Sequence, residues 1–228
     1  MDTKTGHWVD EVWGYKSAGL FTSQDQITNL PYDLDLKGNT TIKIGDLNIQ
    51  DINDDKKIDW RDKVVVAKGT TPHWMMGSNI NLKYRSFDFS ALLQGAFGYS
   101  TYAALRGGFG GIFSSRFYET RWTEATNDPN ALTPRINGAL YNRSQTDFYY
   151  KNSLYVRLKT VALGYTLPKQ WLNAAGIEQF RVFASGTNML TFNKLRTYEI
   201  DPEAAMDVNA LKLYPQQRVI SLGVNVSF

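Results

Sequence analysis

The chain ends in Gln217-Arg218-Val219-Ile220-Ser221-Leu222-Gly223-Val224-Asn225-Val226-Ser227-Phe228, a stretch in which residue character alternates with a period of two. From Ile220 onward every even position is apolar, and every odd position is serine, glycine or asparagine. Because successive side chains of a strand point to opposite faces, this strand has one apolar face and one small, polar face. The apolar face must be buried, in a soluble core or in lipid. A terminal aromatic strand of this length suits a transmembrane barrel, whose strands need roughly 9 to 11 residues.

Four earlier segments alternate in a similar way. We predict five strands in all, at about 74–84, 87–97, 154–166, 179–190 and 217–228. The first two are separated by only two residues, which predicts a tight hairpin.

The third predicted strand changes phase part of the way along. Leu158 lies on one parity and Val161 on the other, so we expect a bulge near Lys159. For residues 168–175, which follow this strand, we predict one or two helical turns that end at Gly176.

The connections between these strands alternate between long and short. Transmembrane barrels have long extracellular loops and short periplasmic turns. The predicted fold class is therefore all-β, with antiparallel strands that form the C-terminal portion of a transmembrane β-barrel. Residues 1–73 are predicted as an extracellular region without helices, and 74–228 as barrel strands with extracellular loops 98–152 and 191–216. A soluble β-sandwich would also produce this pattern by chance.

Composition excludes few classes of function. The 228 residues are 43% hydrophobic, with thirteen Tyr, twelve Phe and six Trp, which favours strands and interfaces. The charge of +3 comes from 25 basic and 22 acidic residues spread along the chain, so no nucleic-acid partner is expected. Cysteine is absent, and no arrangement of Ser, His and Asp suggests catalysis. We therefore predict that the chain is not an enzyme.

One acidic stretch has the spacing of a calcium-binding loop. Counted from Asp51, oxygen ligands would come from positions 1, 3, 5, 7, 9 and 12, which are Asp51, Asn53, Asp55, Lys57 (through its backbone carbonyl), Asp59 and Asp62. Position 6 is Lys56 where such loops have glycine, and the last ligand is Asp in place of Glu. The predicted calcium would have a structural role. The alternative is a surface turn that its own Asp and Asn side chains stabilise.

Aromatic residues are concentrated in the connection 98–152: Tyr99, Tyr102, Phe109, Phe113, Phe117, Tyr118 and Trp122. Such rings stack on sugars or pack against peptides, but a long loop also needs some core of its own, and that second interpretation is favoured. Trp74 and Trp171 suit an aromatic girdle at the two ends of the strands, although core packing would explain each equally.

The segment Ser153-Leu154-Tyr155-Val156-Arg157-Leu158-Lys159-Thr160-Val161-Ala162-Leu163-Gly164-Tyr165-Thr166-Leu167-Pro168 resembles a signature of SusC/RagA-type TonB-dependent transporters. Further matching motifs occur in the same order as in that family: Gly14-Tyr15-Lys16, Gly19-Leu20-Phe21, Gly45-Asp46, Arg121-Trp122-Thr123, Ser185-Gly186-Thr187-Asn188-Met189-Leu190-Thr191 and Tyr214-Pro215. Several dispersed motifs in order are more specific than any one of them.

The resemblance implies a protein of the cell outer membrane that is in contact with lipid and imports oligosaccharides or peptides. It also implies a SusD-like lipoprotein partner, and TonB as a second partner through an N-terminal part that is missing here. Family members are several-fold longer, so we expect this chain to be a fragment that lacks the signal peptide, the plug and most of the barrel. Substrate-binding residues stay unknown.

Two other classes of function stay open. The first is a soluble or surface calcium-binding β adhesion module, which would fold in buffer without detergent. The second is a siderophore- or cobalamin-type TonB-dependent receptor, against which the segment 154–168 and the loop at Asp51 argue.

Overall fold

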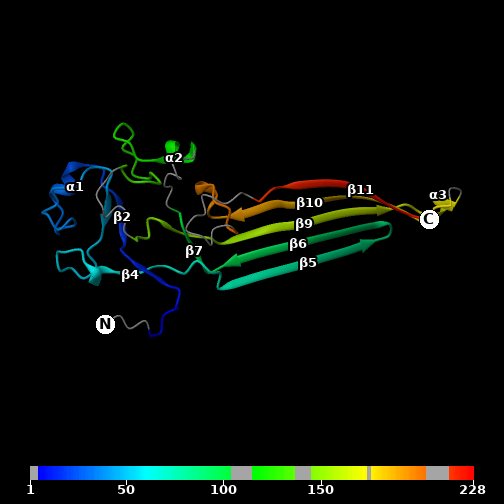
Figure 1. The fold of residues 1–228 in the computed structure, drawn as a ribbon, viewed down its shortest axis with the longest axis horizontal. Helices are drawn as coiled ribbons and strands as arrows, with labels where there is room; N and C mark the ends of the chain where they lie inside the picture. The colour runs from blue at the N-terminus through cyan, green and yellow to red at the C-terminus, as the bar shows by residue number, and fades with distance from the viewer. Residues whose placement is uncertain (1–4, 104–114, 137–144, 174–175, 204–215) are drawn as a thin grey trace. The chain divides into compact units, whose positions relative to one another are not determined.

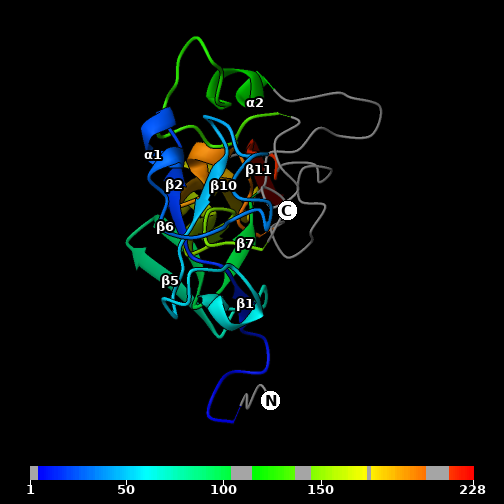
Figure 2. The same ribbon diagram turned by 90° about the vertical axis from the view of Figure 1, so that its left-hand side faces the viewer.

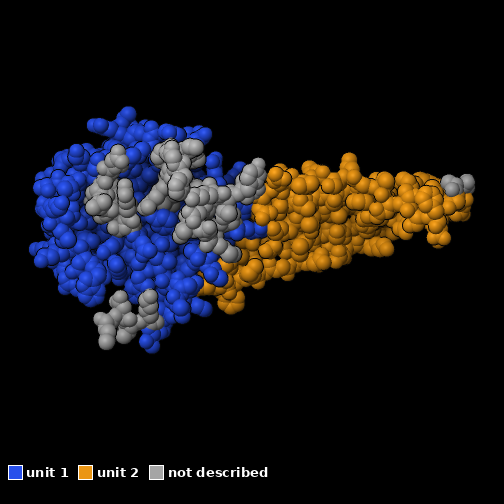
Figure 3. Space-filling model, viewed as in Figure 1, with its two compact units in different colours: residues 1–71, 99–152, 195–213 blue, residues 72–98, 153–194, 214–228 orange. Residues whose placement is uncertain are grey.

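A computed structural model describes residues 5–103, 115–136, 145–173, 176–203 and 216–228. The described chain is mostly antiparallel β-structure and divides into two compact units. Unit 1 comprises residues 1–71, 99–152 and 195–213, and unit 2 comprises residues 72–98, 153–194 and 214–228 (Figure 3). None of the helices among the described residues is long and apolar enough to cross a membrane.

Unit 2 is one five-stranded antiparallel sheet with the strand order β11-β10-β9-β6-β5 (Figure 1). Its strands are β5 (Trp74–Tyr84), β6 (Phe87–Phe97), β9 (Tyr155–Thr166), β10 (Gln179–Asn193) and β11 (Val219–Ser227). Each strand lies where the alternation of the sequence places it. The largest difference is that β10 continues past the expected end at Leu190, because Thr191, Phe192 and Asn193 still pair with β9.

The hairpin between β5 and β6 has the two-residue turn that the sequence predicts. Tyr84 pairs directly with Phe87, and Arg85 adopts a positive φ of 53°. A positive φ is uncommon for a residue other than glycine, asparagine or aspartate, so the turn is formed despite an unfavourable residue type.

The predicted bulge in β9 is present at Lys159. On β6, the adjacent residues Leu92 and Leu93 pair with Thr160 and Leu158, so Lys159 has no partner residue in that register. Over this stretch β9 therefore has one residue more than β6, which is the definition of a β-bulge. The extra residue corrects the phase of β9, so that the apolar residues on both sides of it lie on the same face.

The turn after β9 contains the short helix α3 (Lys169–Leu172). Pro168 is its N-cap residue, and Gly176 has a φ of 67°. Only one turn of helix is described, which agrees with the expected one or two turns; residues 174–175 of the predicted segment lie outside the described residues.

Unit 1 corrects the expectation that residues 1–73 contain no helix. This region contains α1 (Gln24–Thr28) and the 3₁₀ turn η1 (Trp60–Asp62). Both begin at a capping box, formed by Ser23 and Gln26 in α1 and by Asp59 and Asp62 in η1. A single turn that is stabilised by its cap is too short to produce helical periodicity, which explains why the sequence pattern does not reveal it.

Unit 1 also contains pairs of short strands. They are β1 (Val12–Gly14) with β4 (Val64–Ala67), β2 (Ser17–Leu20) with β3 (Leu47–Ile49), and β7 (Ser100–Tyr102) with β8 (Tyr150–Asn152). The connections also contain α2 (Ser115–Thr120) and the 3₁₀ turn η5 (Arg196–Tyr198). Figure 2 shows several of these short elements from a second direction.

A hydrophobic core joins the segments of unit 1. Phe21, Leu47 and Ile49 are almost completely buried, and Trp122 and Ala131 from the connection 98–152 belong to the same cluster. Segments that the sequence predicts as separate loops therefore fold together, with a core of their own.

We expect deletion of Lys159 to leave the faces of β9 intact, because the residues on either side would then alternate regularly. Deletion of Ala162 would turn Leu163 and Tyr165 to the polar face and cost at least about 3 kcal/mol. Thermal unfolding in detergent, monitored by circular dichroism, measures the stability of both deletion variants. Equal effects of the two deletions would contradict the assigned register.

Candidate functional site

The five-stranded sheet has one continuous apolar face. The register places Leu82, Phe89, Leu163, Ala184 and Leu222 side by side in one row across all five strands. Directly paired residues in an antiparallel sheet point to the same face, so these side chains form an unbroken apolar band. The rows on either side also contain only apolar or aromatic residues and one glycine: Ile80, Ala91, Val161, Gly186 and Ile220, then Tyr84, Phe87, Tyr165, Val182 and Val224.

This apolar face is exposed in the isolated chain. Leu222 and Phe228 retain 82% and 84% of their accessible surface, and Leu163 in the middle of the sheet retains 52%. Soluble monomers rarely expose contiguous apolar patches of this extent. The face therefore needs a further apolar environment.

The opposite face of the sheet is more polar, although it also carries Leu92, Phe183 and Val219. One of its rows contains Asn81, Ser90, Ala162, Ser185 and Ser221. The serine and asparagine side chains make this face suited to contact with water or polar groups. The two faces of the sheet thus differ in chemical character.

An ion pair crosses this polar face between two strands that are not neighbours. Arg181 of β10 donates from Nε to Asp88 Oδ1 of β6 at 2.9 Å, and from Nη2 to Oδ2. Gly164 of β9 lies between them, and a Cβ atom on that residue would collide with Arg181 Nη2 and Asp88 Oδ1. Gly164, which belongs to the segment 153–168, therefore leaves space for the bidentate contact between Arg181 and Asp88.

Phe183 packs against a second glycine, Gly223, which also leaves space because it has no Cβ. Its ring lies where a Cβ on Gly223 would be, and the Arg181 guanidinium stands 4.9 Å from the centre of the ring. Sequence reasoning did not identify this group of residues. The available signal was a pair of glycines, one in β9 and one in β11, on the more polar face of the sheet.

Trp74 and Trp171 are 63% and 68% exposed, at opposite ends of the strands of unit 2. Trp74 begins β5, whereas Trp171 belongs to α3, which follows the far end of β9. Burial in a core therefore does not account for either side chain. The assignment to an aromatic girdle stays a prediction.

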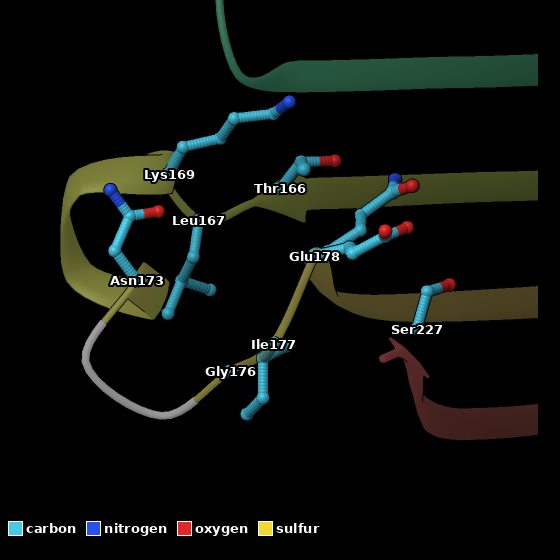
Figure 4. Close-up of a pocket in the computed structure, with 9 residues that line it drawn as sticks. Thr166, Leu167, Lys169, Asn173, Gly176, Ile177, Glu178 and Ser227 are labelled. Atoms are coloured by element: carbon cyan, nitrogen blue, oxygen red, sulfur yellow. The ribbon is translucent and has the colours of Figure 1, made fainter.

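A polar pocket of about 740 Å³ lies at the end of the sheet next to α3 (Figure 4). Lys169 of α3 and its C-cap residue Asn173 line it, together with Glu178, which precedes β10, and Ser227 at the end of β11. The Glu178 backbone N–H donates to the Ser227 carbonyl at 2.8 Å. The strands thus end in polar surroundings, as required where a sheet leaves an apolar layer.

In the loop from Asp51 to Asp62, the first residues accept hydrogen bonds from the loop's own backbone. Asp51 accepts from Asp54 N at 2.9 Å and Lys56 N at 2.8 Å, and Asn53 Oδ1 accepts from Asp55 N at 3.0 Å. Lys56 has a φ of 66°, the left-handed conformation for which calcium loops have glycine at this position. The backbone bends as the spacing predicts, and the side chains form a hydrogen-bonded turn.

Asp62, the predicted last ligand, is fully buried and has another role. Its Oδ1 accepts from Ile52 N at 3.0 Å, and its Oδ2 accepts from Asp59 N at 2.8 Å. These contacts close the two ends of the loop on each other.

Arg61 contacts two other predicted ligands, at 2.7 Å from Asp55 Oδ2 and 2.8 Å from Asp59 Oδ2. Its side-chain hydrogen bonds lower the pKa of the Asp59 carboxyl. In the part of the chain that the structure describes, no three His, Cys, Asp or Glu residues are grouped to hold a metal ion. Calcium binding by Asp51, Asn53, Asp55, Lys57, Asp59 and Asp62 stays a prediction.

The aromatic residues of the connection 98–152 differ in exposure: Tyr99, Phe117 and Trp122 are buried, Tyr102 is half-buried and Tyr118 is exposed. Trp122 belongs to the same core as Phe21 and Leu47, so this ring does not pack the connection only against itself. Phe109 and Phe113 lie outside the described residues.

We expect Gly164→Ala to destabilise the sheet by about 1–3 kcal/mol, because the new methyl group displaces the Arg181–Asp88 contact. Gly77→Ala is the matched control, because this strand glycine lies on the same face with open space around it, and a change within about 0.5 kcal/mol is expected. The stabilities of the two variants are compared by thermal unfolding. Equal stability would show that the ion pair does not need the glycine.

If the Asp51 loop binds calcium, addition of about 1 mM Ca²⁺ should raise the melting temperature, since a ligand that binds only the folded state stabilises it. Asp51→Ala should abolish the shift, whereas Asp54→Ala, outside the ligand positions, should keep it. The site would be ruled out if calcium did not raise the melting temperature of the wild-type protein, or if it raised the melting temperatures of the two variants equally.

Comparisons with known proteins identify relatives of one kind, although no family model matches the chain. The chain is 30% identical over 244 residues to TonB-dependent receptor P26 of Formosa agariphila, covering 98% of the chain and 23% of that receptor. It is 25% identical to receptor P3 of the same organism, with 99% and 23% covered. It is also 25% identical to TonB-dependent receptor SusC of Bacteroides thetaiotaomicron, with 78% and 17% covered.

The fold matches solved structures as well. Two structures of RagAB, described as a peptide transporter and as a peptide importer in its open-open state, match with TM-scores of 0.61 and 0.60 at 16% and 17% identity. Each match covers 96% of this chain and 23% or 22% of the solved chain. The chain therefore spans less than a quarter of these relatives, which belong to a non-enzymatic family of transporters. From its sequence and its fold together, this chain is a homologue of SusC/RagA-type TonB-dependent receptors over about a fifth of their length.

Proposed function

We propose that this chain supplies the C-terminal strands of the transmembrane barrel in a TonB-dependent importer of the outer membrane. One observation carries the proposal: an exposed apolar face runs without interruption across all five strands, and the opposite face is more polar. A barrel wall needs this division, because its outer surface contacts acyl chains and its inner surface faces a polar lumen.

The edges of the sheet are consistent with a place in a larger wall. β5 and β11 are its two outer strands in the described residues, and each has a neighbour on one side only. Unpaired backbone groups are too costly in hydrocarbon to remain at a lipid-exposed edge. Further strands of the importer would pair with both edges and close the barrel.

The proposed cargo is an oligosaccharide or a peptide. The peptide alternative is supported by the RagAB structures, which are described as those of a peptide importer, and the oligosaccharide alternative rests on the resemblance to SusC-type receptors. By the same relationship, a SusD-like lipoprotein would cover the long loops on the extracellular side. TonB would act through a part of the importer outside this chain.

The two rival functions make different predictions. A soluble calcium-binding adhesion module would need to hide the apolar face within its own fold, yet Leu222 and Phe228 are more than four fifths exposed. A siderophore or cobalamin receptor would share the barrel, but the similarity of sequence is to receptors that include SusC.

The test compares Leu222→Arg with Ser221→Arg in the protein at its full natural length. Arginine at position 222 would face lipid and cost about 2–4 kcal/mol near the middle of the membrane, whereas position 221 lies on the polar face. We expect less folded receptor in the outer-membrane fraction for Leu222→Arg and a nearly normal amount for Ser221→Arg.

Equal amounts of the two variants would contradict the proposal. So would a wild-type protein that purifies in buffer without detergent as a cooperatively folding monomer, since that result would favour the adhesion module.

A further inference from the structure

The turn between β5 and β6 carries a cation on the apolar side of the sheet. This turn, Arg85 and Ser86, lies at the end of unit 2 where α3 also lies (Figure 1). The guanidinium carbon of Arg85 lies 5.3 Å from the centre of the Tyr84 ring. Tyr84 belongs to the apolar face, because it pairs with Phe87, which in turn pairs with Tyr165. The charge of Arg85 therefore lies at the end of the face that is proposed to contact lipid.

Aromatic rings form the end of that face. Tyr84 and Phe87 are 69% and 51% exposed, and the ring of Phe87 packs against that of Tyr165 with 4.7 Å between the ring centres. Rings that carry a polar group at one end, as tyrosines do, are typical of the layer where lipid headgroups meet acyl chains. In a bilayer the three rings would lie beside the glycerol backbone and the first carbons of a lipid.

The turn does not need the arginine side chain for its own structure. Arg85 has a φ of 53°, a conformation that favours glycine, asparagine or aspartate. Within the part of the chain that the structure describes, its guanidinium contacts the Tyr84 ring and makes no hydrogen bond or ion pair. The Ser86 carbonyl holds the turn beside β9, because it accepts from Thr166 N at 2.8 Å. An unfavourable residue whose charge is unused in its own fold indicates a ligand from outside.

No carboxylate of the described residues lies within ion-pair distance of Arg85. Asp88 is three residues away, but it binds Arg181 on the more polar face of the sheet. Lys83 pairs with Asp88 in the register, so this second cation of the hairpin also lies on the more polar face. At this corner the apolar face thus ends in a positive charge, which favours a ligand with a negative charge.

We propose that Arg85 binds the phosphate of an anionic phospholipid, whose acyl chains lie along Leu82 and Phe89 on the apolar face. The planar guanidinium matches a phosphodiester, and its long stem reaches from the apolar layer to the level of the headgroup. Phosphoglycerol has no cation of its own, so its phosphate charge attracts Arg85, whereas the ammonium of phosphocholine offsets that charge. The short turns of a barrel are periplasmic, so the lipid belongs to the periplasmic leaflet. The inference rests on the proposed function and adds a lipid site to it.

The experiment uses the full-length protein in bilayers of phosphatidylcholine with a minor fraction of phosphatidylglycerol. A fluorophore is attached at Leu82→Cys, or at Leu222→Cys as the control, after any other cysteine has been replaced by serine. Both positions lie in one row of the apolar face and are 61% and 82% exposed, but they belong to the two opposite outer strands of the sheet. Bromine on the acyl chains of one lipid at a time quenches the fluorophore, and the ratio of the two quenching constants measures which lipid lies beside each label.

We expect phosphatidylglycerol to be favoured about fivefold at position 82, the effect of one basic residue near a membrane surface, and to have no advantage at position 222. Arg85→Gln should remove the preference at position 82. Lys83→Gln removes a cation of the same hairpin from the more polar face and should leave the preference unchanged.

The inference is overturned if position 82 shows no preference between the two lipids, if position 222 shows the same preference, or if Arg85→Gln and Lys83→Gln have the same effect. These results differ from a failure of the proposed function. A label at position 82 that neither brominated lipid quenches would show that the apolar face does not contact lipid, and would overturn both.

Discussion

Contact between one face of the sheet and an apolar environment is the constraint on which the structure of unit 2 depends. Leu222, Leu163 and their neighbours lie in rows that cross five strands, and Leu222 and Leu163 keep 82% and 52% of their surface exposed in the chain alone. Each square ångström of such surface costs about 25 cal/mol in water. Lipid would remove that cost without a second layer of protein, and the polar opposite face would then line a lumen.

Two local features keep the faces separate along the whole sheet. The bulge at Lys159 restores the phase of β9, so that Leu158 and Val161 share the apolar face although their positions differ in parity. On the other face, Gly164 lets Arg181 reach Asp88 across an intervening strand. The charged groups are therefore satisfied by each other on the polar side.

The sequence predicted unit 2 well, because the period of two depends only on neighbouring residues, and even the bulge was visible as a change of parity. Unit 1 was not predictable in the same way. Its core brings Phe21, Leu47 and Trp122 together from distant segments, and its helical turns are too short for periodicity. In the acidic loop the spacing correctly suggested a tight curl. The burial of Asp62 and the position of Arg61 depend on three-dimensional contacts that spacing does not reveal.

The most direct test of lipid contact places a single spin label on one or the other face of β11. These 228 residues contain no cysteine, and any cysteine in the rest of the full-length protein is first replaced by serine. Labels at Leu222→Cys and Ser221→Cys, in the full-length protein in lipid bilayers, are compared for relaxation by oxygen and by a water-soluble nickel complex. The account predicts that the label at position 222 responds to oxygen and is shielded from nickel, and that the label at 221 shows no lipid contact. Equal responses at the two positions, or a label at 222 that nickel reaches freely, would contradict it.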